Sequence, residues 1–474
     1  MSALRGSVKF ALVASAAAVG VLGAVVIGPV QPAVVEASSS LGAGGEMHII
    51  DPPRRILDTR PANAINDRDR PGAKVLPALH APGERFEVQV LGQGGLPAEP
   101  SRVLGVLVNI TVVEPTQAGY LSAWGSNRAR NSESSIVNFA ANQTVPNSAL
   151  VMPGDGGKLT VELVGYGQGV SGQAHVLIDV AGWISSSSNP DTGLRVVPAG
   201  PQLIYESRTN ALGHPLGIAQ TVPIPIRGVG VDGTQVPATA QAVLLNITAF
   251  NDLPGSAPTY VSAVPYDLAP GTEPSTSTLN LARGEIKSNL AIVPVPADGA
   301  IRAFNSAGMV HLEVSIVGYL ASGTPGTRAG RVVPLETPFR IIDTRHGIAG
   351  APQGRLSAGM AEDWDFAEAA AQVRVGGSQV GPQSGFLANL TVAGIERPAG
   401  WYGRIDSYVA AYPSIAGPGG QPRTRNVQVR DGAAVPNMGL FRYGSGDQEY
   451  RLRVYNEAGN VNYLFDIAAV ILAD

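Results

Sequence analysis

An acidic residue and an arginine two positions apart recur three times in the sequence. The three pairs are Asp58 and Arg60, Glu206 and Arg208, and Asp343 and Arg345. Residues i and i+2 of a β-strand share a face, so each arginine can form a fork of hydrogen bonds to the carboxylate beside it. The alternative explanation of the three carboxylates is a catalytic or metal site that is present in each copy. Because the middle copy keeps both an acid and an arginine, we predict that each pair stabilises its own domain.

Three asparagines stand in N-x-T triplets, the acceptor pattern for N-glycosylation. Asn109, Asn246 and Asn389 each lie within an apolar run, as in "VLVNITVV". An acceptor triplet needs an exposed loop, so we predict instead that these amides satisfy backbone groups where a neighbouring loop crosses the sheet. Asn147 and Asn437 follow Val-Pro, and this context predicts a turn.

The remaining polar residues show no pattern that is typical of catalysis or metal binding. No histidine recurs in all three copies, and the G-x-S-x-G, H-E-x-x-H and P-loop motifs are absent from the sequence. The stretch "NDRDRPG" at 66–72 resembles a calcium loop, but it lacks the closing glutamate and its arginines would repel a cation. We predict no catalytic, cofactor or metal site, although a pair of glycosidase carboxylates that meets only in three dimensions stays open.

Aromatic residues near one recurring turn are the candidates for contact with a ligand. Tyr120 and Trp124 follow the turn "PTQAG", and the other copies place Tyr260 and either Trp401 or Tyr402 in the same neighbourhood. Exposed rings of this kind offer flat apolar faces with polar edges. Exposure along one groove would therefore indicate glycan binding, whereas burial between sheets would argue against it.

Four motifs recur in the same order and divide the chain into three copies. Each copy contains the acid–arginine pair, the N-x-T strand, a motif around Asn147, Asn289 or Asn437, and an apolar closing strand. Equivalent positions lie about 140 residues apart, which is a domain-sized period. We predict homologous domains at 47–186, 197–322 and 331–474, joined by linkers rich in serine, glycine and proline at 185–193 and 321–330.

The local pattern within each copy is that of β-strands. Val106 and Val108 face one side of the first N-x-T strand, while Leu107 and Asn109 face the other. Strands bounded by Gly-Pro-Asn turns predict an all-β protein with three tandem homologous β-sandwich or jelly-roll-like domains. The one helix-like stretch, 361–373, stands where the first copy has the strand "GERFEVQVLG".

Composition favours the same fold class and excludes one class of partner. Apolar residues make up 44% of the 474 and charged residues only 15%, while 58 glycines and 37 prolines supply turns. A net charge of −4 gives no basic surface for nucleic acid. The chain has no cysteine, so disulfides and thiol chemistry are excluded.

The N-terminal segment predicts export. Arg5 and Lys9 precede a long uncharged run, and Val35 and Ala37 are small residues at the positions that a signal peptidase requires. We predict a Sec-type signal peptide over 1–37. The alternative is an uncleaved membrane anchor, because the uncharged run is long enough to cross a bilayer.

The recurring motifs resemble a repeat family of exported proteins in high-GC Gram-positive bacteria. The shared order is R-[IL]-[LI]-D-T-R, V-x-x-N-[IV]-T-V, A-G-Y-L, T-V-P-N and D-V-A-G-[WY], and it covers nearly everything after the predicted signal peptide. The second copy departs at Glu206 and at "KSN", the third copy departs at "DIAAV", and the cysteines common in the family are missing. The resemblance implies β-rich extracellular modules and carries over no catalytic residue.

Two functional hypotheses follow from these patterns. The first is a non-catalytic structural or adhesive protein at the cell surface or outside the cell, with loops that contact the envelope, other surface proteins or further copies in an ordered assembly. The second is a secreted protein that binds or cleaves cell-wall or environmental glycans. Contact with a membrane is expected only through the N-terminal segment, if that segment is retained.

Overall fold

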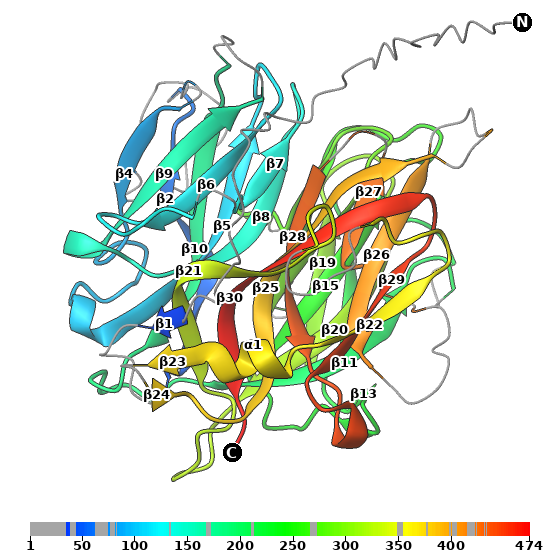
Figure 1. The fold of residues 1–474 in the computed structure, drawn as a ribbon. Coiled ribbons are helices and arrows are strands. Elements are labelled where there is room, and N and C mark those ends of the chain that lie inside the picture. Colours follow the sequence, from blue (N-terminus) through cyan, green and yellow to red (C-terminus); the bar gives the residue numbers. More distant parts are fainter. Residues whose placement is uncertain are drawn as a thin grey trace, which may run out of the picture.

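The structure is a computed structural model in which almost all regular structure is β-strand. It describes residues 35–37, 44–61, 74–75, 81, 83–131, 134–166, 172–209, 213–265, 273–347, 354–375, 378–397, 400, 405–414, 422, 424–430, 432 and 434–474. The prediction of an all-β protein is confirmed. Figure 1 shows the strands as three groups that follow one another along the chain.

The first group, which we call repeat 1 (47–185), forms two sheets. The inner sheet has the order β3-β2-β10-β5-β8, and the outer sheet has the order β4-β9-β6-β7. The inner strands are β2 (Met47–Asp58), β3 (Lys74–Val75), β5 (Val103–Val113), β8 (Val145–Val151) and β10 (His175–Ser185). The outer strands are β4 (Arg85–Gln89), β6 (Gly119–Gly125), β7 (Val137–Phe139) and β9 (Lys158–Gly165).

The second group, repeat 2 (195–321), has the same two sheets in the same order, except that the described residues include no counterpart of β3. The inner sheet is β11-β20-β15-β18 and the outer sheet is β12-β19-β16-β17. The inner strands are β11 (Arg195–Glu206), β15 (Ala242–Phe250), β18 (Ile286–Pro294) and β20 (His311–Ala321). The outer strands are β12 (Gln220–Pro225), β16 (Thr259–Pro265), β17 (Leu279–Leu281) and β19 (Ala300–Asn305), and a hairpin of β13 (Gly230–Val231) and β14 (Thr234–Gln235) is added.

The third group, repeat 3 (332–472), repeats the order again. The inner sheet is β21-β30-β25-β28 and the outer sheet is β22-β29-β26-β27. The inner strands are β21 (Val332–Asp343), β25 (Gln383–Glu396), β28 (Ala434–Arg442) and β30 (Asn460–Leu472). The outer strands are β22 (Ala361–Asp365), β26 (Asp406–Pro413), β27 (Val427–Arg430) and β29 (Arg451–Asn456).

The helix-like stretch of repeat 3 divides into a strand and a helix. β22 takes the edge position that β4 has in repeat 1, so the strand alternative holds for this part. The alanine-rich part forms the short helix α1 (Ala367–Gln372), since alanine is the best helix former. The strands β23 (Val373–Val375) and β24 (Ser378–Gln379) follow.

Each repeat has a hydrophobic core between its two sheets. In repeat 1 the core takes Val106 and Val108 from the inner strand β5 and Leu159 and Val161 from the outer strand β9. Repeat 2 has a separate core of the same kind. These positions are the ones that the period-two pattern assigned to one face of β5.

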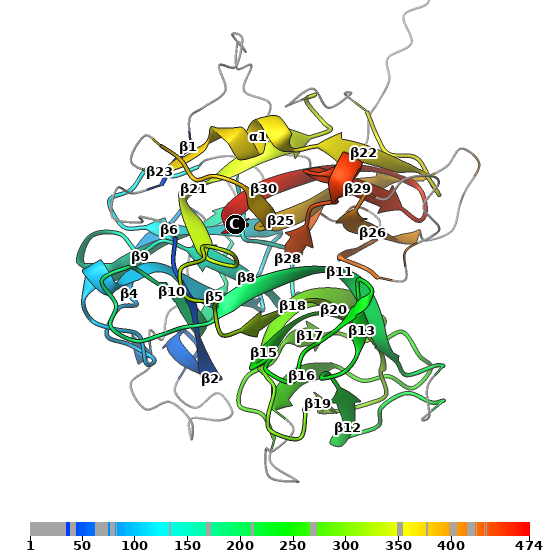
Figure 2. The same ribbon diagram turned by 90° about the horizontal axis from the view of Figure 1, so that it is seen from below.

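The opposite face of each inner sheet is buried as well. Leu107 belongs to a third cluster, which contains the core of repeat 3 and also Leu150 of repeat 1 and Leu290 of repeat 2. The inner sheets therefore pack against one another in the middle of the molecule. Figure 2 shows the three repeats as lobes around this middle, near the C-terminus. Strands buried on both faces read as continuous apolar runs, and "VLGVLVNITVV" is such a run.

The turns before the central edge strands are built alike. Asn142, Gly284 and Gly432 all have a left-handed backbone, with φ of 60°, 81° and 71°. Only glycine, and to a lesser extent asparagine, adopts this conformation readily. The three hairpins place β8, β18 and β28 side by side at the centre.

The N-terminal segment lies mostly outside the described residues, and so does most of the predicted signal peptide. Its described part is β1 (Val35–Ala37), whose backbone pairs in parallel with β23. Within the described parts of the chain, no helix combines the length and the apolar character needed to span a bilayer.

Candidate functional site: the junctions between the repeats

The acid–arginine pairs form the predicted forks. Asp58 is fully buried, and its carboxylate accepts hydrogen bonds from the backbone N, Nε and Nη2 of Arg60 at 3.0, 3.0 and 2.7 Å. Asp343 and Arg345 repeat this geometry with distances of 3.0, 2.9 and 2.7 Å. The motif thus closes the end of the first strand in two repeats and holds the chain as it leaves the sheet.

The middle copy keeps the contact in altered form. Arg208 Nε lies 2.7 Å from Glu206 Oε1, and Arg208 Nη2 lies 2.5 Å from Glu313 Oε1. Glu313 also accepts a hydrogen bond from Arg425 of repeat 3, at 2.8 Å. The arginine of repeat 2 is therefore shared between two glutamates, and one of these is bound across a junction.

In repeats 1 and 3 the aspartate of each fork is also bound by a second arginine, which the sequence analysis did not predict. Arg340 makes two hydrogen bonds of 2.9 Å to Asp466 and one of 3.4 Å to Asp343. Arg55 makes the same contacts with Asp179 and Asp58. The sequence signal was the arginine that precedes the motif in "RRILDTR" and "FRIIDTR", which the second copy replaces with Leu203.

The two carboxylates bound by Arg340 have opposite pKa shifts. Burial acts to raise the pKa of Asp343, but the hydrogen bonds and charge of Arg345, together with Arg340, outweigh burial and hold this pKa below its ordinary value. Burial prevails at Asp466 and raises its pKa, with Arg340 opposing the shift. Asp466 therefore depends on Arg340 for its charge.

The middle residue of the motif is a fixed hydrogen-bond acceptor. Thr59 and Thr344 accept from the backbone N of Val176 and Tyr463 through Oγ1, at 2.8 and 3.1 Å. Ser207 does the same for Leu312 in repeat 2. This contact joins the first strand of each repeat to its closing strand.

The N-x-T asparagines connect the three repeats in a closed order. Asn109 of repeat 1 donates to the carbonyl of Ser277 in repeat 2, at 3.4 Å. Asn246 of repeat 2 donates to the carbonyl of Arg425 in repeat 3. Asn389 of repeat 3 donates to the carbonyl of Ser135 in repeat 1, at 2.8 Å, and this completes the circle. The prediction that a neighbouring loop receives these amides is confirmed, and the loop belongs each time to the next repeat.

The asparagines of the V-P-N motif lie in strands, so the prediction of turns was wrong. Asn147 lies in β8 and Asn437 in β28, because the proline before each asparagine is itself part of an edge strand, near its start, and not of a bend. Asn147 donates to Oδ1 of Asn389 at 3.1 Å, and Asn437 donates to Oδ1 of Asn246 at 3.3 Å. Each asparagine thus continues the inter-repeat contacts.

The junction between repeats 1 and 2 is the least complete of the three. Asn289 stands at the V-P-N position of repeat 2, and its Nδ2 donates to the carbonyl of Thr278. The Oδ1 of Asn109 is buried and has no hydrogen-bond partner. The repeat whose motif departs from V-P-N to "KSN" is therefore also the one that supplies no hydrogen bond to the N-x-T asparagine of its neighbour.

Taken together, the contacts run from repeat 1 to repeat 2, from 2 to 3 and from 3 back to 1. An interface that joins unlike surfaces of successive units forms a ring when the rotation closes. The three repeats form such a ring around the strands β8, β18 and β28. We call the six asparagines at its centre the asparagine belt; they are Asn109, Asn147, Asn246, Asn289, Asn389 and Asn437.

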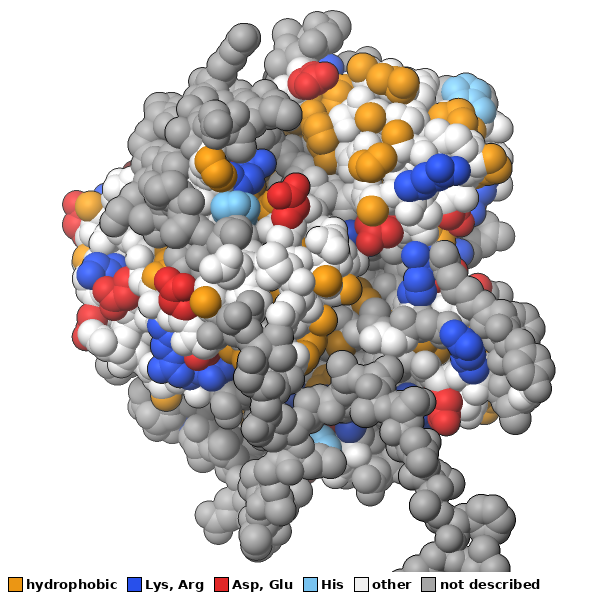
Figure 3. All heavy atoms as spheres, turned by 90° about the horizontal axis from the view of Figure 1, so that it is seen from above, with side chains coloured by type: hydrophobic (Ala, Val, Ile, Leu, Met, Phe, Trp, Pro, Cys, Tyr) orange, Lys and Arg blue, Asp and Glu red, His pale blue; other side chains and the backbone are white. Residues whose placement is uncertain are grey.

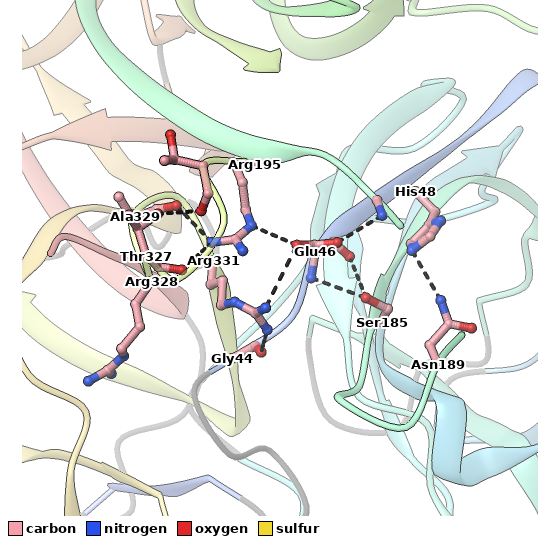
Figure 4. A network of polar contacts seen from close by, with 12 residues as sticks. Gly44, Glu46, His48, Ser185, Asn189, Arg195, Thr327, Arg328, Ala329 and Arg331 are labelled. Atoms are coloured by element: carbon pink, nitrogen blue, oxygen red, sulfur yellow. Dashed lines mark hydrogen bonds and ion pairs between the residues drawn. The ribbon is translucent and has the colours of Figure 1, made fainter. Parts of the chain in front are cut away.

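One end of the ring is held by a partly buried acid between two arginines (Figure 4). Glu46 Oε1 lies 2.8 Å from Nε of Arg195 and 3.7 Å from Nη2 of Arg331. Its Oε2 accepts a hydrogen bond from the backbone N of Gly193 at 2.8 Å. Arg195 is the first residue of β11, and Glu46 and Arg331 directly precede β2 and β21. One of the three charges therefore stands at the start of each repeat.

Backbone hydrogen bonds join the same three segments. Met47 and Leu194 exchange two bonds of 2.8 Å, and Gly45 and Val332 do the same. The third side is closed by the backbone N of Val196, which donates to the carbonyl of Gly330 at 2.9 Å. The starts of all three repeats are thus paired with one another.

The charge of Glu46 is expected to make this end of the ring sensitive to acid. Burial acts to raise its pKa, but Gly193, Arg195 and Arg331 outweigh burial and lower it. A lowered pKa in the folded state stabilises the fold above the ordinary pKa of glutamate, and this stabilisation is lost as the pH falls through the folded value. Glu46→Gln should therefore be less stable than the wild type at pH 7, and the difference should shrink below roughly pH 4.

Chemical denaturation at several pH values measures this difference. Glu99→Gln is the matched control, because Glu99 is 61% exposed and lies 3.7 Å from Arg102 on the surface. Its effect should stay within about 0.5 kcal/mol at every pH. A Glu46→Gln effect that is the same at pH 7 and pH 3 would contradict the role assigned to this charge.

The other end of the ring is polar as well. Lys287 donates to the carbonyl of Thr144 in repeat 1 at 3.0 Å and lies 2.8 Å from Glu285. Gln143 of repeat 1 binds the same glutamate at 3.1 Å. Arg430 of repeat 3 donates to the carbonyl of Gly284 in repeat 2. Both ends of the central contact are therefore closed by inter-repeat hydrogen bonds.

The predicted aromatic contacts do not form an exposed platform. Trp124 is 9% exposed, and Arg85 and Arg130 lie over its ring at 5.7 Å from the centroid. Tyr120 accepts a hydrogen bond from Arg130, and the ring of Tyr260 contacts Phe304.

In repeat 3 the residue equivalent to these tyrosines is not the predicted Trp401 or Tyr402. Tyr120, Tyr260 and Tyr408 pair with Asn138, Asn280 and Gln428, so Tyr408 holds the equivalent position. Trp401 and Tyr402 lie outside the described residues. The three equivalent rings are packed against other side chains, and this does not favour the groove that glycan binding needs.

A small cavity of about 50 Å³ lies between repeats 1 and 3. Trp124 and Ser148 line it from repeat 1, and Leu335 and Met438 line it from repeat 3. In the register of the inner sheets, Ser148 corresponds to Leu290 and Met438. The smaller side chain explains the space at this junction.

The described parts of the chain contain no cluster of side chains that could hold a metal ion. No three potential metal ligands come together there. The calcium-like stretch at 66–72 lies outside the described residues. His175 and His311 bind Thr59 and Ser207 at the strand ends, and burial lowers the pKa of both imidazoles. These histidines therefore support the recurring motif.

The charges on the surface are mixed. Figure 3 shows acidic and basic side chains interspersed over one face, without a continuous region of one sign.

Comparisons with known proteins identify no family for this chain. No protein-family model matches the chain, and no curated protein matches its sequence. One similar structure is the N-terminal CBM22-1–CBM22-2 tandem domain of Xyn10C from Paenibacillus barcinonensis. It is 12% identical, has a TM-score of 0.15, and the match covers 57% of this chain and 98% of that one.

Two viral structures are also similar. A chain of Sulfolobus Turreted Icosahedral Virus is 9% identical, with 82% of this chain and 90% of that chain covered and a TM-score of 0.15. A chain from a structure of a triple jelly-roll fold and turret assembly in an archaeal virus is 8% identical, with coverages of 83% and 92% and a TM-score of 0.14. At these TM-scores the likenesses carry no argument about fold or function.

Proposed function

We propose that this protein is a non-catalytic exported protein that acts at the cell surface or outside the cell as a building block. In this proposal each repeat is a two-layer β-sandwich of jelly-roll type, and the outward loops contact the envelope, other surface proteins or further copies. Export rests on the charged and apolar pattern of the N-terminal segment.

The observation that carries the proposal is that the recurring polar residues form hydrogen bonds that hold the fold together. The acid–arginine pairs lie within the repeats, and the asparagine belt lies between them. Residues that recur in all three copies therefore support the architecture. Such residues would include the reacting groups if each repeat were a catalytic unit.

Two of the outer edge strands are unsuited to pairing with a strand of another molecule. β12 carries Pro223 and Pro225, and β22 carries Glu362, Asp363 and Asp365. Prolines and charges on an edge strand oppose the addition of another strand. The central edge strands β8, β18 and β28 are covered by one another. An ordered assembly of this protein would therefore form through side chains and loops.

Fractionation of cells that produce the full chain tests the proposal. We expect the protein in the envelope or medium fraction, and we expect the purified protein to bind isolated envelopes without releasing sugars or peptides from them. Saturable binding on a glycan array that is lost in Tyr260→Ala, or turnover of a glycan, would instead support the glycan hypothesis. Retention in the cytoplasm would contradict export.

A further inference from the structure

Arg302 in the outer sheet of repeat 2 is a buried cation without a partner. It lies in β19, between Pro223 of β12 and Val264 of β16 in the strand register. The residue is only 5% exposed, and its Nε and Nη2 atoms are enclosed with no hydrogen-bond partner. Among the described residues, no carboxylate lies within ion-pair distance of its guanidinium.

An arrangement of this kind is costly unless a partner arrives from outside. Arginine side chains in proteins are permanently charged donors, and they have no acceptor with which to satisfy a second donor. Enclosing an ion without an opposite charge is strongly unfavourable, and buried charges in proteins are almost always paired. The unpaired arginine therefore points to an anion that the chain itself does not supply.

Repeat 3 shows which chemical group fits this place. Arg453 holds the position of Arg302, and the edge-strand residue opposite it is Asp363. Nε and Nη2 of Arg453 lie 2.9 and 2.7 Å from the two carboxylate oxygens of Asp363. In repeat 2 the same edge position is Pro223. The arginine is thus present in both repeats, while its carboxylate is present in only one.

The edge of the sheet offers an approach to Arg302. Thr221, Pro223 and Pro225 share a face of β12, and all three are exposed. Val264, on the other side of Arg302, is only partly buried. The arginine therefore lies one strand in from an open edge.

We propose that Arg302 anchors a binding site for a carboxylate, which occupies on repeat 2 the place that the side chain of Asp363 has on repeat 3. This site goes beyond the role proposed above, because it gives one of the three repeats a ligand of defined chemistry. The carboxylate can belong to a free organic acid or to a larger molecule that carries one. Acetate is the simplest probe of the shared group.

Thermal unfolding of the full chain in chloride and in acetate, at equal pH and ionic strength, tests the site. Acetate should raise the unfolding midpoint of the wild type in a saturable manner and should leave Arg302→Met unchanged. In chloride, Arg302→Met should be at least as stable as the wild type, because it removes an unpaired buried charge. An equal acetate shift in both proteins, or no shift in either, would overturn the proposal.

A gain-of-partner variant provides an independent test. Pro223→Asp places a carboxylate opposite Arg302, as in repeat 3, and Pro223→Ala controls for the loss of the proline ring. We expect Pro223→Asp to unfold at a higher temperature than Pro223→Ala and to lose the response to acetate. Arg453→Met should destabilise the protein, since it removes the two charged hydrogen bonds to Asp363 and leaves only that of Ser414. Equal midpoints for the two Pro223 variants would contradict the proposed site.

Discussion

Replacing Arg340 with leucine is expected to lower the free energy of unfolding by about 3–5 kcal/mol. The side chain of Arg340 is 9% exposed, and those of Asp466 and Asp343 are 3% and 0% exposed. Removing the arginine leaves the buried carboxylate of Asp466 without the guanidinium that makes both of its charged hydrogen bonds. Urea denaturation monitored by tryptophan fluorescence measures the loss.

The second repeat supplies the matched control for this change. Leu203 and Ser315 pair at the position where repeat 3 has Arg340 and Asp466. The double variant Arg340→Leu with Asp466→Ser copies this uncharged pair and should recover at least half of the lost stability. A double variant that is less stable than Arg340→Leu alone would show that the buried pair is not the cause.

Truncating the asparagine belt is expected to have unequal effects at its three junctions. Asn246→Ala removes the donor to the carbonyl of Arg425 and the acceptor for Asn437, so two polar groups in a buried junction lose a partner. We expect a loss of about 3 kcal/mol. Asn389→Ala removes the equivalent contacts with Ser135 and Asn147, and its effect should be similar.

Asn109→Ala is the internal control for the belt. The single hydrogen bond of Asn109 is 3.4 Å long, and its Oδ1 has no partner, so its truncation should cost about 1 kcal/mol or less. The same denaturation curves rank the three variants. Equal losses at Asn109, Asn246 and Asn389 would contradict the unequal completeness of the junctions.

The elements within each repeat were largely predictable from the sequence. Period-two patterns and turn residues located the strands, and the i, i+2 spacing of Asp58 and Arg60 indicated that they share a face. These are short-range relations, and local stereochemistry fixes them. The same reasoning failed for Asn147 and Asn437, since a proline before asparagine is as compatible with the start of an edge strand as with a turn.

The ring was not predicted, because it depends on contacts between residues far apart in sequence. Asn389 and Ser135 are separated by 254 positions, and no local pattern connects them. One signal was available. The inner strand β5 is apolar on both faces apart from its polar N-x-T positions, so its second face needed a partner as extensive as the outer sheet. Three equivalent strands with the same property would have suggested mutual burial.

Covalent linkage of the repeats allows the three junctions to differ. In a ring of identical chains the position of Glu46 would carry the same charge three times, and like charges would repel at the centre. In this chain the equivalent positions hold Glu46, Arg195 and Arg331, so one acid can bind two bases. The loop residues that receive the N-x-T amides differ in the same way. Two of them are Ser135 and Ser277, whereas the third is Arg425, whose side chain forms an ion pair with Glu313.

Cutting the two linkers tests the closed ring most directly. Protease recognition sequences can be inserted between Asp191 and Thr192 and between Pro325 and Gly326, where the chain is exposed. After both cuts, native mass spectrometry and size-exclusion chromatography should find the three fragments together at the mass of the uncut protein, because each inner sheet is buried against the other two repeats. Separation of the fragments into single repeats at micromolar concentration would contradict the ring.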